Sequence, residues 1–164
     1  MQLFPASAKA GRFRRLSRGP GYLCEVMTAA TLPVLFENPA GQLAADPAGF
    51  MRMTWAATPR TLADTQALLT QLAQALRQRG WGKVLADQTH MPSFSPAEQQ
   101  WIAQEWLPAA VQHSGYRHGA IVVSTNTYAR LATAFITTNV GGLPLRYRSF
   151  DAAAPATAWL VAVA

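Results

Sequence analysis

Short apolar runs alternate along the chain with longer segments of helical periodicity, and turn residues separate them. Such β-prone runs, bounded by glycine, proline or asparagine, are typical of strands. The pattern predicts strands at residues 32–37, 50–55, 81–87, 120–124 and 143–150. Turn residues follow the first run at Asn38-Pro39-Ala40-Gly41. We expect the first two runs to pair as an antiparallel hairpin, with a loose loop around Asp46-Pro47-Ala48-Gly49.

The first helix is predicted after the second strand. Thr61 and Asp64 form a weak capping box, and Gly80 supplies a helix stop. The leucines expected on or near one face of this helix are Leu62, Leu69, Leu72 and Leu76.

Three more helices are predicted, and the clearest signal is Ser95-Pro96-Ala97-Glu98. Serine caps a helix, proline fits its first turn, and Glu98 can reach back to the cap. Pro108 is expected to kink or shorten this helix, because proline removes a hydrogen-bond donor. Asn126 caps the next helix, and Asp151 starts an alanine-rich one that contains Trp159 and Leu160. Side chains expected to point inward from the helix after Asn126 are Tyr128, Leu131, Phe135 and Ile136.

The order of these elements predicts the fold class. Strands that alternate with single helices form a largely parallel sheet. We therefore expect an α/β domain with a mixed sheet of about five strands, mostly parallel with one antiparallel edge strand, and four helices. Residues 30–164 contain neither an internal repeat nor a low-complexity linker, so they are expected to form a single domain.

The net charge of +6 is concentrated near the N-terminus. The basic residues before Met27 are Lys9, Arg12, Arg14, Arg15 and Arg18, and Glu25 is the acidic one. We interpret residues 1–29 as a basic leader that is disordered or lies upstream of a true start at Met27. A mitochondrial transit peptide is the alternative, because the segment is rich in arginine and poor in acids. The rest of the chain is nearly balanced, so the pattern does not favour binding of nucleic acid.

Two further features of the sequence bear on the cellular location of the protein. No uninterrupted apolar stretch is long enough to span a bilayer. The lone Cys24 can form neither an internal disulfide nor a thiolate zinc site. We therefore expect a cytoplasmic protein.

Four segments resemble a known family. They are Trp101-Ile102-Ala103-Gln104-Glu105-Trp106-Leu107-Pro108, Tyr116-Arg117-His118-Gly119-Ala120-Ile121-Val122, Gly142-Leu143-Pro144-Leu145-Arg146-Tyr147, and Ala158-Trp159-Leu160. Over residues 33–161 the chain resembles the STAS superfamily, and more closely the SpoIIAA-like bacterial proteins. The resemblance implies a STAS-like domain that docks onto other proteins and catalyses no reaction.

The resemblance also implies a position for a phosphorylation switch. In members controlled by phosphorylation, the switch serine lies between the third strand and the second helix. Here that junction holds Ser93 and Ser95, but the usual Asp-Ser-Ser-Gly-like turn is absent. Ser95 also has a structural role as a helix cap. The two serines are candidate phosphorylation sites, and the alternative for Ser95 is a purely structural role as a helix cap.

Candidate catalytic groups are few. His113 and His118 lie five residues apart with no carboxylate or cysteine close in sequence, so we expect no metal site and no cofactor. Glu98 and Glu105 are separated by two helical turns, and we expect both on a solvated face. Asp87, Thr89 and His90 follow a strand at the edge where open α/β sheets place ligands. These three residues are a candidate ligand pocket, but no nucleophile is fixed beside them, so an enzyme is not expected.

Two tryptophans suggest a contact surface. Trp101 and Trp106 are about 140° apart around a helix, so both cannot face the core squarely. Together with Glu105 they form a candidate interface for a protein partner or a second copy of the chain. The alternative is that both tryptophans are partly buried at the edge of the core.

The sequence thus leaves two functional hypotheses. The first is a non-enzymatic STAS-like regulatory domain that docks a partner through its second-helix surface. The second is a module that binds a small ligand, a lipid or a nucleotide, near Thr89 and His90. The uncharged interior favours an apolar ligand.

Overall fold

The computed structural model describes residues 31–164, which form one compact unit. The proposed leader at residues 1–29 lies outside the described residues. Within residues 31–164, no helix is both long enough and apolar enough to cross a membrane.

A single six-stranded sheet forms the centre of the described part, and its strands follow one another in sequence order. Its strands are β1 (Val34–Asn38), β2 (Gly41–Asp46), β3 (Phe50–Trp55), β4 (Lys83–Asp87), β5 (His118–Val122) and β6 (Arg146–Phe150). The first three are antiparallel neighbours, whereas β3 to β6 run parallel to one another. The predicted α/β class is confirmed.

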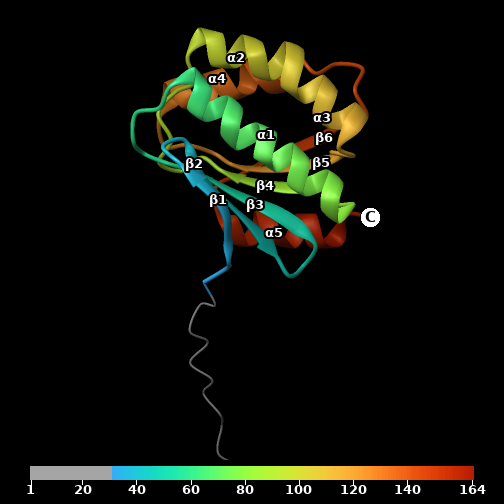
Figure 1. The fold of residues 1–164 in the computed structure, drawn as a ribbon. Coiled ribbons are helices and arrows are strands. Elements are labelled where there is room, and N and C mark those ends of the chain that lie inside the picture. The colour runs from blue at the N-terminus through green and yellow to red at the C-terminus, as the bar shows by residue number, and fades with distance from the viewer. Residues whose placement is uncertain (1–30) are drawn as a thin grey trace, which may run out of the picture. The chain divides into compact units, whose positions relative to one another are not determined.

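The helices cover both faces of the sheet (Figure 1). They are α1 (Leu62–Arg79), α2 (Pro96–Trp101), the π-helical turn η1 (Ile102–Trp106), α3 (Leu107–His113), α4 (Thr127–Thr138) and α5 (Ala153–Ala162). Because α2, η1 and α3 follow one another without a break, they form one helical segment. Helices α1, α2, α3 and α4 lie over one face, and α5 lies alone over the other (Figure 1). The sheet therefore separates a large core from a small one.

The sequence pattern missed strand β2. The structure places it between the two predicted strands, so β1 pairs with β2 and not with β3. Residues of β2 such as Ala44 and Ala45 are poor strand formers, and pairing on both sides compensates for this. The turn at residues 38–41 joins β1 to β2, and a Cβ at Gly41 would collide with the carbonyl oxygen of Thr54. Close strand pairing thus requires glycine there.

The helix caps predicted at Thr61, Ser95 and Asn126 are confirmed, whereas α5 begins after Ala152 without a side-chain cap from Asp151. Thr61 and Ser95 each form a capping box, with Asp64 and Glu98 as the returning carboxylates. Gly80 ends α1 in a left-handed conformation with φ of 65°. Asn126 accepts hydrogen bonds from the backbone N–H groups of Tyr128 and Ala129.

The prediction that Pro108 kinks or shortens its helix was wrong. The helix neither ends nor loses its direction at Pro108, but continues as α3 to His113. The preceding turn η1 widens instead, with the Leu107 N–H bonded to the Ile102 carbonyl five residues back. A π-helical turn of this kind provides space where proline cannot join the regular ladder.

The prediction of which α4 side chains point inward was largely wrong. Tyr128, Leu131 and Phe135 are 76%, 62% and 52% exposed, and only Ile136 points inward as expected. The buried residues of α4 are Ala129, Ala132, Thr133 and Ile136. The helix carries two stripes at helical spacing, and the one with smaller side chains faces the sheet because it permits close packing. Leu62 of α1 is likewise exposed.

Candidate ligand cavity

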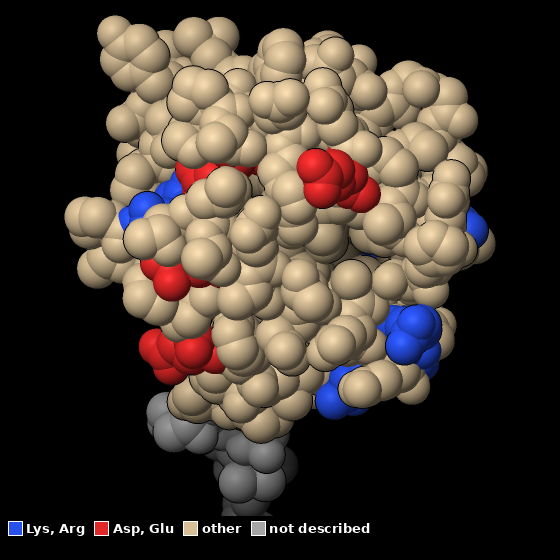
Figure 2. Space-filling model, turned by 45° about the horizontal axis from the view of Figure 1, so that its top comes forward, with Lys and Arg blue, Asp and Glu red and all other residues tan. Residues whose placement is uncertain are grey.

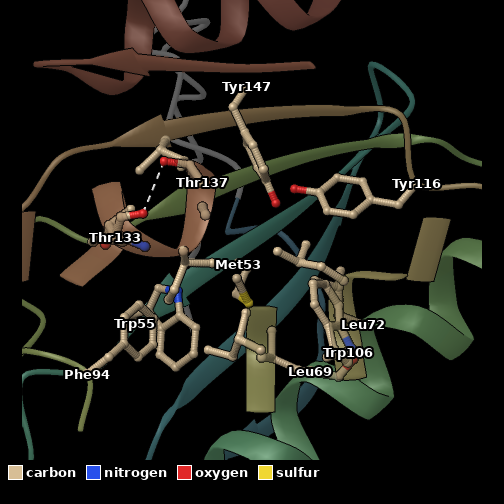
Figure 3. A pocket seen from close by; sticks show the side chains of 16 residues that line it. Met53, Trp55, Leu69, Leu72, Phe94, Trp106, Tyr116, Thr133, Thr137 and Tyr147 are labelled. Carbon is tan, nitrogen blue, oxygen red and sulfur yellow. Dashed lines mark hydrogen bonds between the residues drawn. The ribbon is translucent and has the colours of Figure 1, made fainter. Parts of the chain in front are cut away.

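An internal cavity of about 60 Å³ lies between the sheet and the helices that cover its larger core. Met53, Ala86 and Ile121 line it from β3, β4 and β5, and residues of α1, the α2–α3 segment and α4 complete the wall. Figure 3 shows side chains from these elements converging on one space. Of the described side chains that line it, none is charged. The cavity is therefore a mainly apolar site with a few hydrogen-bonding groups.

Trp55 is the lining residue of this cavity whose buried donor lacks a hydrogen-bond partner. Its side chain is 3% exposed, and it packs edge-on against Phe94 with ring centroids 5.1 Å apart. Among residues 31–164, its indole Nε1 is the one buried side-chain nitrogen or oxygen with no hydrogen-bond partner. This nitrogen points toward the interior of the cavity (Figure 3). A buried donor without an acceptor costs about 1–3 kcal/mol, so it calls for an explanation.

The other polar groups of the cavity are better satisfied. Gln88 accepts a hydrogen bond from Thr133 Oγ1 at 2.8 Å through its Oε1. Trp106 donates from Nε1 to the carbonyl oxygen of Leu69 at 2.8 Å. Trp55 and Trp106 therefore differ, although both are buried in the same wall. Of the fully buried side-chain nitrogen and oxygen atoms among residues 31–164, the indole nitrogen of Trp55 alone lacks a partner.

Tyr116 and Tyr147 provide hydroxyl groups that face one another at the other side of the cavity (Figure 3). Their rings meet edge to face, with centroids 6.2 Å apart. Burial raises the pKa of both phenols well above the ordinary value, and for Tyr147 the adjacent Tyr116 raises it further. Gly119 makes this arrangement possible, because a Cβ there would collide with the Tyr147 ring. Both hydroxyls thus remain neutral donors and acceptors.

These raised pKa values predict a loss of stability in alkali. Above pH 10, the ordinary pKa, the unfolded chain releases protons that the folded chain retains, so the free energy of unfolding falls as pH rises. We expect Tyr147→Phe to make this fall shallower between pH 10 and 11.5. Urea denaturation at a series of pH values measures it. An identical slope in both proteins would contradict the burial of a neutral Tyr147 hydroxyl.

The π-helical turn η1 contributes directly to the cavity wall. Ile102 and Trp106 lie at its two ends, and Leu107 follows it; all three line the cavity. π-helical turns are rare and occur frequently at functional sites, where they displace side chains from regular helical positions. Here the turn sets Trp106 so that its indole reaches Leu69.

The partly exposed part of the cavity wall lies on α4 and β6. Most of the lining residues are buried, but Thr137 of α4 and Tyr147 of β6 are partly exposed. Residues 139–145 connect these two elements and include Gly141 and Gly142.

A buried ion pair lies on the other side of Trp55. Arg60 Nε and Glu98 Oε1 are 2.7 Å apart, and both side chains are about 5% exposed or less. Thr65 and the backbone N–H of Ser95 also donate to Glu98. The Arg60 guanidinium stacks on the Trp55 ring, 5.2 Å from its centroid. The expectation that Glu98 lies on a solvated face was wrong, because Arg60 pairs with it, whereas Glu105 is exposed.

The pocket predicted at Asp87, Thr89 and His90 is a shallow surface hollow. Thr89 and His90 border it together with Ser124 and Asn126, at the carboxyl ends of the strands. Asp87 does not border it, but holds Thr89 through hydrogen bonds to its N–H at 3.0 Å and its hydroxyl at 2.6 Å. The structure thus brings these residues together, but the internal cavity is a separate site.

The candidate phosphorylation sites lie close to α2. Ser95 Oγ accepts the Glu98 N–H at 3.2 Å as the helix cap, and Ser93 Oγ contacts the Phe94 carbonyl at 3.3 Å. Ser95 is exposed and Ser93 half-buried. A phosphate on Ser95 would have to replace the hydrogen bonds of the capping box.

The candidate interface is divided between surface and core. Glu105 is exposed and Trp101 half-buried, whereas Trp106 is 8% exposed and belongs to the core. Trp106 therefore cannot contribute to a docking surface in this conformation. Trp101 and Trp106 differ in exposure because their positions on the helical segment point in different directions.

The remaining histidines form no cluster. His118 lies in β5 and packs edge-on against Trp159, and burial, with the charges of Arg146 and Lys83, lowers its pKa. His113 lies at the end of α3. No group of three metal-ligating side chains occurs among residues 31–164.

Sequence reasoning missed Trp55, Arg60 and the two tyrosines as functional candidates. Trp55 appears in the sequence analysis only as the end of a predicted strand, and Tyr116 and Tyr147 appear only in segments that resemble the STAS superfamily. The alternation of apolar residues in β3 places Met53 and Trp55 on one face, which was a usable signal for shared burial. Nothing in the sequence indicates that the Trp55 donor lacks a partner.

Comparison with protein families, with curated proteins and with solved structures gives no match for this chain.

Proposed function

We propose that this chain is a binding module that holds a small molecule in the cavity between β3, α1, the α2–α3 segment and α4. The unpartnered Nε1 of Trp55 is the observation that carries the proposal. A ligand acceptor would satisfy it and recover the cost of the buried donor. The site supplies hydrogen-bond donors and apolar contacts, which hold a molecule without reacting with it.

The form of the cavity supports this function. Apolar walls with a few convergent polar groups are the usual composition of small-molecule sites. The wall includes a π-helical turn, and Thr137 and Tyr147 of the lining are partly exposed. The cavity is smaller than the hollow at Thr89 and His90 but better enclosed.

A filled cavity tests the proposal. Ala86 of β4 faces the cavity, while Ala120 of β5 lies in the small core on the opposite face of the sheet. We expect Ala86→Leu to change the free energy of unfolding by less than about 1 kcal/mol, because the added atoms enter empty space. Ala120→Leu should cost about 1–3 kcal/mol, because it overpacks a filled core. Urea denaturation of both variants measures these values.

Native mass spectrometry then connects the cavity to binding. Protein isolated gently from its own cells is expected to carry an added small mass, which Ala86→Leu should lose while remaining folded. If Ala86→Leu and Ala120→Leu destabilise equally, and no small mass accompanies the unaltered protein, the proposal fails.

Self-association is a second candidate function, in keeping with the STAS-like resemblance. The specific observation is the outward face of α4, where Tyr128, Leu131 and Phe135 are exposed. Grooves of about 390 Å³ and 480 Å³ lie on either side of this ridge. A ridge and a groove on one face can meet those of a second copy about a twofold axis. Figure 2 shows that charged side chains are sparse over the helices.

Sedimentation measures this second candidate. We expect a concentration-dependent dimer that Leu131→Glu abolishes, since the change places a charge in the contact. Leu62→Glu, at an exposed leucine of α1, is the matched control and should leave the dimer intact. A monomer at every concentration would remove the candidate.

A further inference from the structure

We infer that the ligand of the internal cavity is a small uncharged molecule with a hydrogen-bond acceptor, such as a carbonyl oxygen, that receives the Trp55 indole N–H. The inference rests on the proposed function and adds the chemical class of the ligand. Its basis is the combination of one free donor with a lining that has no charged side chain.

The acceptor follows from the chemistry of the indole. An indole nitrogen carries a proton that it can only donate, so a ligand atom that satisfies Trp55 must be an acceptor. The Arg60 guanidinium over the ring draws electron density from it, which makes the N–H a better donor. The neighbouring Phe94 offers no acceptor group. The partner must therefore come from within the cavity.

The lack of charge follows from the lining. A charged ligand would lose its hydration in the cavity and gain no counter-charge from the described lining, which is costly in a site of low polarity. The nearest ionic groups are Arg60 and Glu98, and each already neutralises the other. The Tyr116 and Tyr147 hydroxyls are neutral and can solvate a second polar group of the ligand at the side opposite Trp55.

The volume limits the size of the ligand. The cavity of about 60 Å³ is less than half the roughly 150 Å³ that accepts a benzene ring in an engineered protein core. The enclosed part of the ligand is thus a group of a few non-hydrogen atoms. A longer molecule would have to extend beyond the cavity.

Three probes of equal size and similar shape test the class. Acetone is a neutral acceptor, isobutene lacks the acceptor, and acetate carries a charge. Each is titrated into ¹⁵N-labelled full-length protein. The Trp55 indole N–H resonance, assigned with Trp55→Phe, is followed by NMR together with the backbone amide resonances of the cavity lining, which also report binding to the variant. We expect acetone to shift this resonance downfield and to bind about five- to tenfold more tightly than isobutene, as the loss of one hydrogen bond predicts. Acetate should not bind measurably.

A variant separates two claims: that the cavity binds a small molecule, and that this molecule accepts the Trp55 N–H. Trp55→Phe removes the donor but keeps an aromatic ring, so it should weaken acetone about five- to tenfold and leave isobutene unchanged. If isobutene binds as tightly as acetone, or if Trp55→Phe has no effect on acetone, the inferred ligand class is wrong while the cavity still binds. If neither neutral probe perturbs the cavity resonances, the proposed function itself fails. A persistent nuclear Overhauser contact between the Trp55 N–H and water at saturating acetone would also overturn the inference, because water would then be the partner.

Discussion

Replacing Trp106 by alanine is expected to lower the free energy of unfolding by about 3–5 kcal/mol, the usual cost of removing a large aromatic side chain from a core. Trp106 is 8% exposed, its ring lies 6.0 Å from that of Tyr116, and its Nε1 donates to the Leu69 carbonyl. The change would remove part of the cavity wall and leave the Leu69 carbonyl with only its hydrogen bond inside α1. Urea denaturation at pH 7 measures the loss.

Trp101 is the matched control for this prediction. It is half-buried on the same helical segment and only borders the core, so Trp101→Ala should cost clearly less than Trp106→Ala. The comparison distinguishes a core role from a docking role for Trp106. If Trp106→Ala leaves stability nearly unchanged and instead weakens association, the residue belongs to an interface and the structure of this wall is wrong.

Replacing Glu98 by alanine should cost a comparable amount, about 3–5 kcal/mol, because it leaves the buried Arg60 guanidinium without a counter-charge. The change also removes the acceptor for Thr65 and half of the capping box at Ser95. Glu105→Ala, at an exposed carboxylate on the same helical segment, should stay within about 0.5 kcal/mol of the unaltered protein. Equal effects at the two sites would show that the ion pair does not hold the helices.

The double variant Arg60→Met with Glu98→Met isolates the buried charge. Apolar residues in place of both partners avoid an unpaired ion, so the double variant should be more stable than Glu98→Ala. A double variant that is less stable than either single change would contradict this reading of the pair.

The same carboxylate gives a pH dependence. Burial alone raises the pKa of Glu98, but hydrogen bonds from Thr65, Arg60 and the Ser95 N–H, with the Arg60 charge, outweigh it and place the pKa below 4.5. The stabilisation from this group is therefore present above pH 4.5 and is lost as pH falls through the folded-state value. Glu98→Gln should flatten the acid limb of the stability profile. An unchanged acid limb in this variant would assign acid lability to other groups.

Local signals in the sequence were sufficient for most of the fold. Capping residues such as Ser95 and Asn126 and the stop at Gly80 act through bonds to their own neighbours, so their roles are visible in the sequence. Strand β2 was missed because its alanines are held by pairing on both sides, which is a tertiary effect. The phase of α4 was wrong for a similar reason, since both of its stripes have helical spacing and only packing selects Ala129 and Ala132.

The candidate site was much less accessible to sequence reasoning. Thr89 and His90 were recognised by their position after a strand, and the structure places them in a hollow at that edge. The internal cavity depends on contacts between residues that are far apart in the sequence, such as Trp55 with Phe94 and Tyr116 with Tyr147. An unpartnered donor such as Trp55 Nε1 is a property of the packed structure and has no local signature.

A crystal structure of the protein isolated from its own cells without unfolding tests the proposed cavity most directly. The proposed function predicts electron density inside the cavity that is larger than a water molecule, with an acceptor atom about 2.7–3.2 Å from Trp55 Nε1. A cavity that contains only ordered water, or that side chains have closed, would contradict it.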